Sequence, residues 1–374
     1  MQATAVIGAN FGDEGKGLMT DFLAAMNPTG TVVVRFNGGA QAGHTVATLS
    51  GCRHVFHHFG SGSLAGARTF LSRFFIVNPF LWDKERRELA DTFPSMLVDK
   101  RAMLSTPFDM LINQEVELSR GGRRHGSCGI GINETVERCS GPLATFVSDM
   151  ENPNRLREIL KETAQHSITR LEQLGFMPSE FFLDMLGSET LVASYLTLCE
   201  QFRQAVHVVE DGTSLPNYDH IVFEGAQGLL LDEKHRFFPH VTRSRTGLHN
   251  VALLSKELGV QDVRAIYVTR TYMTRHGAGP FPTERPDVSF DDPTNAPNEW
   301  QGSLRFGELD LNLIAESISR DLFDAHGLNV LPTLAMTCLD QLTKADPKTI
   351  AAACGIQLGY ISRGPSRDYV SLIK

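Results

Sequence analysis

The sequence predicts an α/β fold built on a large, mainly parallel central sheet with helices on both faces. Several short apolar runs, rich in Val and Ile, have the length and composition of buried strands. These runs are residues 4–8, 31–36, 220–223, 263–269 and 329–337. Helix-like stretches separate them at residues 17–26, 154–174, 248–258 and 308–321. Near-continuous apolar strands that alternate with helices are typical of parallel sheets covered on both faces.

The order of these elements also predicts where the chemistry takes place. In an open parallel sheet the ligand crevice lies beyond the carboxyl ends of the strands. Polar, glycine-rich segments follow the first two predicted strands directly, so they are the first candidates for a site. Because we find no internal repeat and no low-complexity tract, we expect residues 1–374 to form a single domain.

Two segments are predicted to be long loop insertions. Residues 119–133 are glycine-rich and basic, and residues 285–302 are rich in Pro and Asp without periodicity. Loops of this length inside a compact domain are often binding elements, although plain surface insertions are the alternative. We expect both segments to become ordered when substrates bind.

Composition argues against several classes of protein. Hydrophobic residues make up 42% of the chain and charged residues 21%, which is typical of a folded globular protein. The net charge of -8 and the lack of a concentrated basic run argue against a nucleic-acid partner. Six cysteines without a CxxC pair predict reduced thiols and a cytoplasmic location. We expect neither a signal peptide nor a membrane span, since no apolar run approaches about 18 residues.

The strongest local signal is the segment GANFGDEGKG, residues 8–17, between a predicted strand and a predicted helix. Glycines allow backbone N–H groups to approach a phosphate, Lys16 supplies a positive charge, and the helix N-terminus adds its dipole. It is not a standard P-loop, because six residues instead of four separate Gly8 from Gly15 and because Gly17 replaces the Ser or Thr that binds Mg²⁺. The additional Asp13 can ligate Mg²⁺ or act as a base.

A second glycine-rich segment, RFNGGAQAGHT at residues 35–45, follows the next predicted strand. A lone histidine is usually structural. His44, however, stands where it can reach the same crevice as Asp13. An acid and a histidine that converge on one pocket suit proton removal at one atom and charge stabilisation at another.

Taken together, these two segments resemble the adenylosuccinate synthetase family. GDEGKG followed about thirty residues later by GGxxAGHT is similar to the family's phosphate site, and three further blocks match in order. These blocks are FEGAQGLLLD at residues 223–232, PHVT at 239–242 and TRHGAGPFPTE at 274–284. The resemblance therefore extends over most of the chain.

The resemblance implies a two-step ligase reaction. Asp13 takes the N1 proton of a 6-oxopurine nucleoside monophosphate so that O6 attacks the γ-phosphate of a nucleoside triphosphate, and L-aspartate then displaces phosphate from C6. His44 hydrogen-bonds the phosphoryl oxygens, while Lys16 serves the donor phosphates. Mg²⁺ is held by Asp13 and the carbonyl of Gly43. The alternatives from other classes are a non-catalytic nucleotide-binding regulator and a P-loop signalling switch.

The same resemblance implies four sets of binding residues. The donor phosphates are assigned to Gly12, Glu14, Gly15, Lys16, Gly17, Gly43 and Thr45. The donor base is assigned to Thr337, Asp340 and Gly364. The purine monophosphate is assigned to Asn37, Gln41, Ser127, Cys128, Arg138, Gln227 and Thr242. Aspartate is assigned to Gly302, Ser303, Arg305 and His276. Arg138 lies where the family has an arginine donated across a homodimer interface, so we expect a homodimer.

The sequence also departs from the family pattern. Where the family has an arginine-rich loop that binds aspartate and approaches the ribose, residues 301–310 keep only Arg305. One arginine can still clamp a carboxylate. Ser303 and Leu304 remove long donors from the sugar side, which suits a deoxyribose. Cys338 replaces the Lys of the guanine-reading TKLD segment, so ATP or dATP becomes a credible donor beside GTP.

These departures resemble the phage branch of the family, the N6-succino-2-amino-2′-deoxyadenylate synthases, which use dGMP on the way to 2-aminoadenine DNA. In addition, His276 stands where the conventional enzymes have Val, and Cys128 alters the family's phosphate-binding Thr pair. The alternative is the conventional enzyme acting on IMP, with these departures as ordinary divergence.

Overall fold

The computed structural model describes residues 1–90, 94–290, 292, 295, 302–325, 327–342 and 346–373. Within these residues, ten strands form one sheet in the order β16-β15-β14-β11-β1-β10-β2-β5-β7-β9. All neighbouring strands are parallel except β15 and β16, which are antiparallel. The α/β class with a large, mainly parallel sheet is therefore confirmed.

The strands of the sheet are β1 (Gln2–Gly8), β2 (Thr31–Arg35), β5 (Arg68–Leu71), β7 (Met96–Asp99), β9 (His207–Val209), β10 (His220–Glu224), β11 (Asp262–Arg270), β14 (Asn329–Thr337), β15 (Gln357–Ser362) and β16 (Val370–Leu372). Short pairs outside it are β3 (His44–Ala47) with β4 (Arg53–Phe56), β6 (Ile76–Val77) with β8 (Met103–Leu104), and β12 (Met273–Arg275) with β13 (Arg305–Gly307). The helices are α1 (Lys16–Ala25), α2 (Pro79–Leu89), α3 (Pro107–Arg120), α4 (Ile132–Cys139), α5 (Pro153–Gln173), α6 (Glu180–Leu186), α7 (Glu189–Ala205), α8 (Leu248–Leu258), α9 (Leu311–Asp324) and α10 (Pro347–Ala353).

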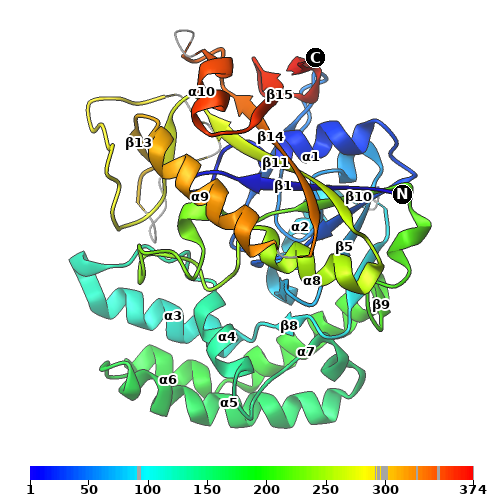
Figure 1. Ribbon diagram of the computed structural model, residues 1–374. Coiled ribbons are helices and arrows are strands. Elements are labelled where there is room, and N and C mark those ends of the chain that lie inside the picture. The colour runs from blue at the N-terminus through cyan, green and yellow to red at the C-terminus, as the bar shows by residue number, and fades with distance from the viewer. Residues whose placement is uncertain are drawn as a thin grey trace.

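Helices cover both faces of the sheet because its central strands are apolar on both sides (Figure 1). On β1, Val6 packs with Met19 and Leu23 of α1 on one face. On the other face, Ile7 belongs to the main core together with Leu254 of α8. Alternate residues of a strand point to opposite faces, so this single strand buries side chains in two cores.

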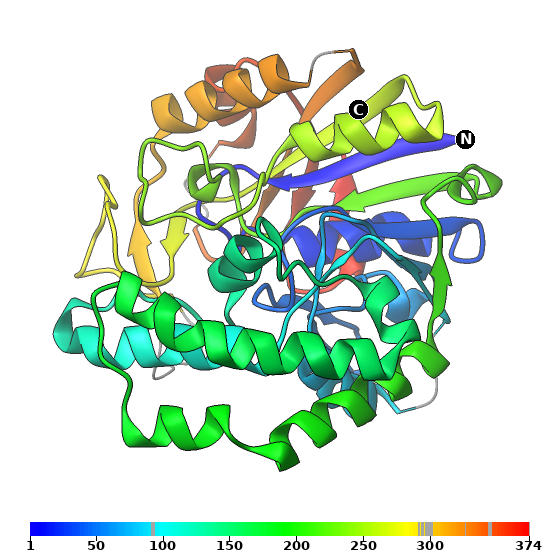
Figure 2. The same cartoon turned by 90° about the horizontal axis from the view of Figure 1, so that it is seen from below.

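The helices α3 to α7 form a separate layer beside the sheet, seen at the bottom of Figure 1 and in front in Figure 2. This layer has its own core, in which Phe108, Leu160, Tyr195 and Phe202 are fully buried with Trp82 of α2. The space between this layer and the carboxyl ends of the central strands holds the candidate site.

All five predicted strands are present, and each predicted helix is found within three residues of its expected ends. The predicted loop at 119–133 is shorter than expected, because Arg120 ends α3 and Ile132 begins α4. Most of residues 291–301, in the second predicted loop, lie outside the described residues. No helix in the described part of the chain is long and apolar enough to cross a bilayer.

Candidate functional site

The carboxyl ends of the central strands open into a cavity of about 630 Å³. Its lining comes from the loop after β1, from the segment around β3, from α3 and α4, and from the residues after β10 and β12. Asp13, Lys16 and His44, which the sequence predicts to be catalytic, all line it. The parallel sheet thus brings together residues that are far apart in the sequence.

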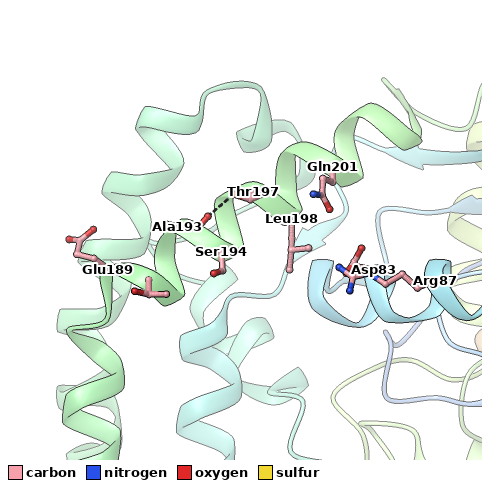
Figure 3. Close-up of a pocket in the computed structure, with 9 residues that line it drawn as sticks. Asp83, Arg87, Glu189, Ala193, Ser194, Thr197, Leu198 and Gln201 are labelled. Atoms are coloured by element: carbon pink, nitrogen blue, oxygen red, sulfur yellow. Dashed lines mark hydrogen bonds and ion pairs between the residues drawn. The ribbon is translucent and has the colours of Figure 1, made fainter.

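A second hollow of about 640 Å³ lies on the surface between α2 and α7 (Figure 3). Its lining side chains come from these two helices, and Arg87 pairs with Asp83 at 2.6 Å. Glu189 at its rim pairs with Arg157 at 3.3 Å. Because none of the nine lining residues belongs to a glycine-rich segment after a strand, the cavity at the sheet edge is the better candidate.

The loop between β1 and α1 is folded around the carboxylate of Glu14. Its Oε1 accepts hydrogen bonds from the backbone N–H groups of Asn10, at 3.0 Å, and Gly12, at 2.8 Å. Its Oε2 pairs with Lys16 Nζ at 2.6 Å. Glu14 is only 1% exposed, so it shapes the predicted phosphate loop from inside. The ammonium of Lys16 has three hydrogens, which leaves donors for a phosphate.

Gly17 explains why the loop departs from a standard P-loop. A Cβ at this position would lie 2.9 Å from the carbonyl oxygen of Thr45 and 3.2 Å from Cβ of His44. The first turn of α1 therefore packs directly against β3 and leaves no room for a Ser or Thr side chain. This close packing also places His44 beside the N-terminus of the helix.

Asp13 has a left-handed backbone conformation, with φ of 61°, and its carboxylate lines the cavity. Its Oδ2 lies 3.0 Å from Nε2 of His276. Burial acts to raise the pKa of Asp13, but the hydrogen bond and charge of His276, with the charges of Arg270 and Lys16, outweigh it and lower the pKa to about 2. Asp13 is therefore ionised at neutral pH. His276, predicted to bind aspartate, lines the cavity but contacts this acid and Asn295.

His44 is oriented by Glu224, a residue that sequence reasoning did not single out. Burial lowers the pKa of His44 to about 4, against the opposing effect of Glu224, so the ring is neutral and donates from Nδ1 to Glu224 Oε1 at 2.7 Å. Glu224 is itself fully buried and accepts from Ser61, while Arg35 lies 3.8 Å away. Burial acts to raise the pKa of Glu224, but His44 and Arg35 lower it to about 2. The available signal was its place at the strand end, directly after Phe223.

Most residues predicted to bind the purine monophosphate line the same cavity. These are Gln41, Ser127, Cys128, Gln227 and Thr242. The side-chain amide of Gln41 is buried without a hydrogen-bond partner among the described residues, so it is available to a ligand. Asn37 lies deeper, where its side chain exchanges hydrogen bonds of 2.7 and 3.1 Å with the backbone of Ala226. It supports the loop after β10 and is absent from the cavity wall.

Arg138 makes an extensive set of contacts within the chain. Its guanidinium pairs with Asp109 through Nε at 2.9 Å and Nη2 at 2.8 Å. The remaining donors bond to the carbonyls of Leu143 and Leu104 and to Thr145. Because Asp109 also caps the start of α3 through Thr106, the pair is part of the core of the helical layer. Its role across a dimer interface stays a prediction.

Arg305 is also engaged within the chain. It forms a two-pronged ion pair with Glu284, with Nε 2.7 Å from Oε1, and Nη1 donates to the carbonyls of Gly277 and Gly279. The neighbouring Gly302 and Ser303 are exposed. None of these three predicted aspartate-binding residues lines the cavity. An aspartate carboxylate would have to displace Glu284 to reach Arg305.

The residues predicted to bind the donor base follow β14 and β15. Thr337 Oγ1 donates to the carbonyl of Glu14 at 2.7 Å, so it contacts the backbone of the phosphate loop. Asp340 is exposed, and Gly364 packs so closely on the ring of Tyr369 that a Cβ would lie 2.6 Å from it. Of the three, only Thr337 is shown to contact the phosphate loop, and none of them lines the cavity.

Four arginines contribute to the cavity although the chain as a whole is acidic. Arg120, Arg243, Arg270 and Arg275 come from four different segments, and only the fold brings them together. Arg275 is 2% exposed and its guanidinium lies over the ring of Phe11. The other three pair with the carboxylates of Glu117, Glu137 and Asp292, whereas Nε and Nη1 of Arg275 have no hydrogen-bond partner among the described residues, so its charge favours an anionic ligand.

The Asp13 carboxylate and the Gly43 carbonyl are oxygen ligands of the kind that Mg²⁺ prefers. Within the described residues no three His, Cys, Asp or Glu side chains come together as a metal site. A cation here would depend on the Asp13 carboxylate, the Gly43 carbonyl and the phosphates of a substrate. Mg²⁺ typically binds through one or two carboxylates with phosphates and water, and both residues line the cavity, so the donor set fits.

Comparison with known proteins identifies the family to which this chain is similar. A family model described as adenylosuccinate synthetase matches residues 5–359. The adenylosuccinate synthetases of Trichormus variabilis and of a Nostoc species are each 35% identical over 295 residues, which cover 76% of this chain and 63% of theirs. The chain thus matches a little under two thirds of the length of these curated relatives.

Two solved structures share the fold. Fully ligated adenylosuccinate synthetase from Plasmodium falciparum has a TM-score of 0.77 at 17% identity and covers 100% of both chains. The succinoaminodeoxyadenylate synthetase (PurZ) of cyanophage S-2L, bound to dGMP and dATP as an energy donor, has a TM-score of 0.65 at 16% identity, with 99% of this chain and 95% of that one covered.

Proposed function

Since the chain belongs to the adenylosuccinate synthetase family, we propose that it is a carbon–nitrogen ligase that joins L-aspartate to C6 of a 6-oxopurine nucleoside monophosphate, using a nucleoside triphosphate. The observation that carries the proposal is the meeting of Asp13, Lys16 and His44 in one cavity at the N-terminus of α1. A protein that only binds nucleotides needs the glycine-rich loop but not an ionised acid opposite a histidine.

In the first step, the Asp13 carboxylate accepts the N1 proton while O6 of the purine attacks the γ-phosphorus. The bond from that phosphorus to the leaving diphosphate breaks. With a pKa of about 2, Asp13 is ionised but a weak base while His276 holds it. The purine has to replace His276 at this carboxylate, and the loss of that hydrogen bond makes Asp13 more basic.

His44 stabilises the phosphoryl group during this transfer. Its Nε2 is buried without a hydrogen-bond partner among the described residues, and Glu224 fixes the other nitrogen. A polyphosphate beside the ring favours its protonated form, which can donate to a phosphoryl oxygen. Lys16 and the N–H groups at the start of α1 hold the donor phosphates. Mg²⁺ at Asp13 and Gly43 neutralises phosphate charge when it is bound.

In the second step, the amine of L-aspartate attacks C6, and the bond from C6 to the phosphorylated O6 breaks. Inorganic phosphate leaves with the former O6, and the amine loses its protons to the surrounding medium. Water has to be kept away from the 6-phosphoryl intermediate, which hydrolysis would consume. The walls provided by α3 and α4 cover the cavity on the side opposite the sheet.

For the purine, we propose dGMP with ATP or dATP as donor. Ser303, Leu304 and Cys338 support this choice, because they replace long cationic side chains that serve a ribose and a guanine donor in the conventional family pattern. The specific support for the alternative, IMP with GTP, is that the curated relatives are conventional adenylosuccinate synthetases.

We also propose a cytoplasmic location and a homodimer. The homodimer depends on the family resemblance alone, since all the donors of Arg138 are used inside the chain. Sedimentation of the purified protein at micromolar concentration measures its oligomeric state directly, and a monomer would overturn this part of the proposal.

A substrate panel tests the proposed reaction. Purified protein is incubated with Mg²⁺, L-aspartate and ATP, dATP or GTP, and with IMP, dIMP, GMP or dGMP in separate reactions. The succinyl adduct is detected by mass spectrometry. Adduct mainly from dGMP with an adenine donor supports the phage-type reaction, and adduct mainly from IMP with GTP supports the conventional one. No adduct from any pair overturns the ligase proposal, and Asp13→Ala should abolish any adduct.

A further inference from the structure

Three consecutive carbonyl groups of the phosphate loop are each bound by a side chain from a different strand region. The carbonyl of Gly12 accepts from Thr274 Oγ1 at 3.1 Å, and that of Glu14 accepts from Thr337 Oγ1 at 2.7 Å. Between them, the carbonyl of Asp13 accepts from Nε of Arg270. The loop is therefore held on its carbonyl side by residues of β11, β12 and β14.

The central one of these contacts acts on the most strained residue of the loop. Asp13 is a non-glycine residue at φ of 61°, a conformation that costs roughly 1 kcal/mol or more without compensating contacts. A turn at this residue is needed because Glu14 points into the loop while the Asp13 carboxylate faces the cavity. Whatever fixes the Asp13 carbonyl therefore fixes the direction of its side chain.

Arg270 makes this contact as one of three, each from a different nitrogen. Nη1 donates to the hydroxyl of Tyr272 at 2.9 Å, and Nη2 donates to Asp292 at 2.9 Å. The side chain of Arg270 is only 11% exposed. The ring of Tyr272 stacks on Phe290 with 3.8 Å between centroids, and its hydroxyl donates to Gln341 at 2.5 Å. The guanidinium thus joins the phosphate loop to the chain around residues 290–292.

We propose that Arg270 is a positioning residue that fixes the backbone of Asp13 for proton transfer. Through its ion pair with Asp292, Arg270 also makes the geometry of Asp13 depend on the position of Asp292. The kinetic part of the proposal rests on the proposed ligase function. A planar guanidinium is suited to this task because its three nitrogens donate in fixed, divergent directions. A lysine offers one point of charge and cannot hold the carbonyl, the hydroxyl and the carboxylate in the same arrangement.

The kinetic test compares Arg270→Gln and Arg270→Lys with wild type. We expect Arg270→Gln to lower kcat roughly 100-fold, since a displacement of about 1 Å in a reacting group has this effect. KM for the triphosphate should change less than about threefold, because the loop N–H groups and Lys16 remain. Arg270→Lys should recover only part of kcat. Arg236→Gln, which removes an exposed arginine paired with Glu316, is the matched control and should be unchanged.

A purely structural role for Arg270 gives a different pattern. It predicts a lower melting temperature with kcat per folded molecule within about twofold of wild type, and this result would overturn the proposal. The neighbouring tie is a second comparison: Thr274→Val releases the Gly12 carbonyl without touching Asp13. It should lower kcat much less than Arg270→Gln, and an equal loss would also count against a specific role for Arg270.

The link to Asp292 is tested by a double-mutant cycle. Asp292→Asn should lower kcat in the wild-type background and have little further effect in the Arg270→Gln background, because both act through one contact. Losses that simply add would refute the link.

Hydrogen exchange separates failure of this inference from failure of the proposed function. If wild type makes no adduct with any substrate pair, the ligase proposal fails, but the positioning of the loop can still be measured. Exchange in the peptide covering residues 9–17 should be faster in Arg270→Gln than in wild type and unchanged in Arg236→Gln. Equal exchange rates in Arg270→Gln and wild type would contradict the inference whatever the activity.

Discussion

The phosphate loop and the region around Arg305 both carry motifs of the family, but only the first of these regions lines the cavity. Asp13, Lys16 and His44 line one cavity, as their places after β1 and β2 predict. Arg305 instead pairs with Glu284 and lies outside the cavity wall. The first region follows β1 and β2, two parallel strands on either side of β10, whereas the second follows a long insertion, so only in the first does sequence position translate directly into position in the site.

In the helical layer, Arg138 is another motif residue whose side chain is engaged within the chain. The sequence places it near a predicted binding loop, but its fate depends on Asp109, 29 residues away, and on carbonyls at residues 104 and 143. A charged side chain in a motif is a candidate for ligand binding only if no internal partner takes it first. The comparison can be broken or sharpened by five substitutions.

The largest effect is expected from Glu224→Gln. The amide cannot stabilise a protonated His44 as the carboxylate does, and it leaves Arg35 buried with no counter-charge at this position. We expect kcat to fall roughly 100-fold or more, by analogy with the loss of an orienting carboxylate behind a histidine. Steady-state kinetics measures this, with Ser61→Ala as the control that keeps the carboxylate. Unchanged kcat would show that His44 needs no orientation.

Gly17→Ser is expected to have the next largest effect. It introduces the side chain of a standard P-loop, but its Cβ would lie 2.9 Å from the carbonyl of Thr45. Overpacking of this kind costs roughly 1–3 kcal/mol, so the free energy of unfolding should fall by that amount in urea titrations. Gly187→Ser, where a Cβ has an ordinary 3.7 Å contact, should be neutral. A stable and active Gly17→Ser would mean that α1 and β3 are not closely packed.

Glu284→Gln sharpens the comparison at the second region. If aspartate has to displace Glu284 from Arg305, a neutral partner should make this easier and lower KM for aspartate several-fold, with KM for the purine nucleotide unchanged. Arg305→Gln should raise KM for aspartate. If neither variant alters this constant, Arg305 is purely structural and aspartate is bound elsewhere in the cavity.

The smallest effect on activity is expected from Asp321→Asn. Burial raises the pKa of this carboxyl to about 7, although the Leu248 N–H and the Tyr267 hydroxyl act to lower it. Between pH 4 and 7 the unfolded chain ionises this group while the folded chain keeps it protonated, so stability falls as the pH rises through this window. Asp321→Asn should flatten this slope in melts across the window.

The exposed variant Asp262→Asn is the control for the pH series and should keep the wild-type slope. If Asp321→Asn shows the same slope as wild type, the buried carboxyl is not the group responsible, and its hydrogen bonds to Leu248 and Tyr267 hold it ionised.

Sequence reasoning succeeded where one strand carries its own signal. The runs at 4–8 and 329–337 are apolar on both faces, which identifies them as central strands of a parallel sheet. Among the ten strands that the described residues form in the sheet, it missed β5, β7, β9, β15 and β16, and all of these except β15 are only three or four residues long. Such strands have too few residues for a periodicity, and their pairing is decided by neighbours that are distant in the sequence.

Within the site, sequence reasoning found the residues on the loops after β1 and β2 but not those that hold them in place. Glu224 and Arg270 act at the ends of β10 and β11, and nothing in their local sequence reveals that they face His44 and Asp13. The role of Glu14 was also hidden. The local sequence does not show whether its carboxylate binds the backbone of its own loop or faces the ligand. The roles of Glu224 and Arg270 depend on contacts between segments far apart in the sequence, and the role of Glu14 depends on the fold of its own loop.

The most direct test of the proposed 6-phosphoryl route is to follow the oxygen at C6. The accepted monophosphate is labelled with ¹⁸O at this position, and the inorganic phosphate is examined by ³¹P NMR after complete turnover with unlabelled triphosphate and L-aspartate. The 6-phosphoryl route predicts that the label appears in the inorganic phosphate, because O6 attacks the γ-phosphorus and leaves with it. Inorganic phosphate without label would contradict the 6-phosphoryl route and the assignment of Asp13 as the base that starts it.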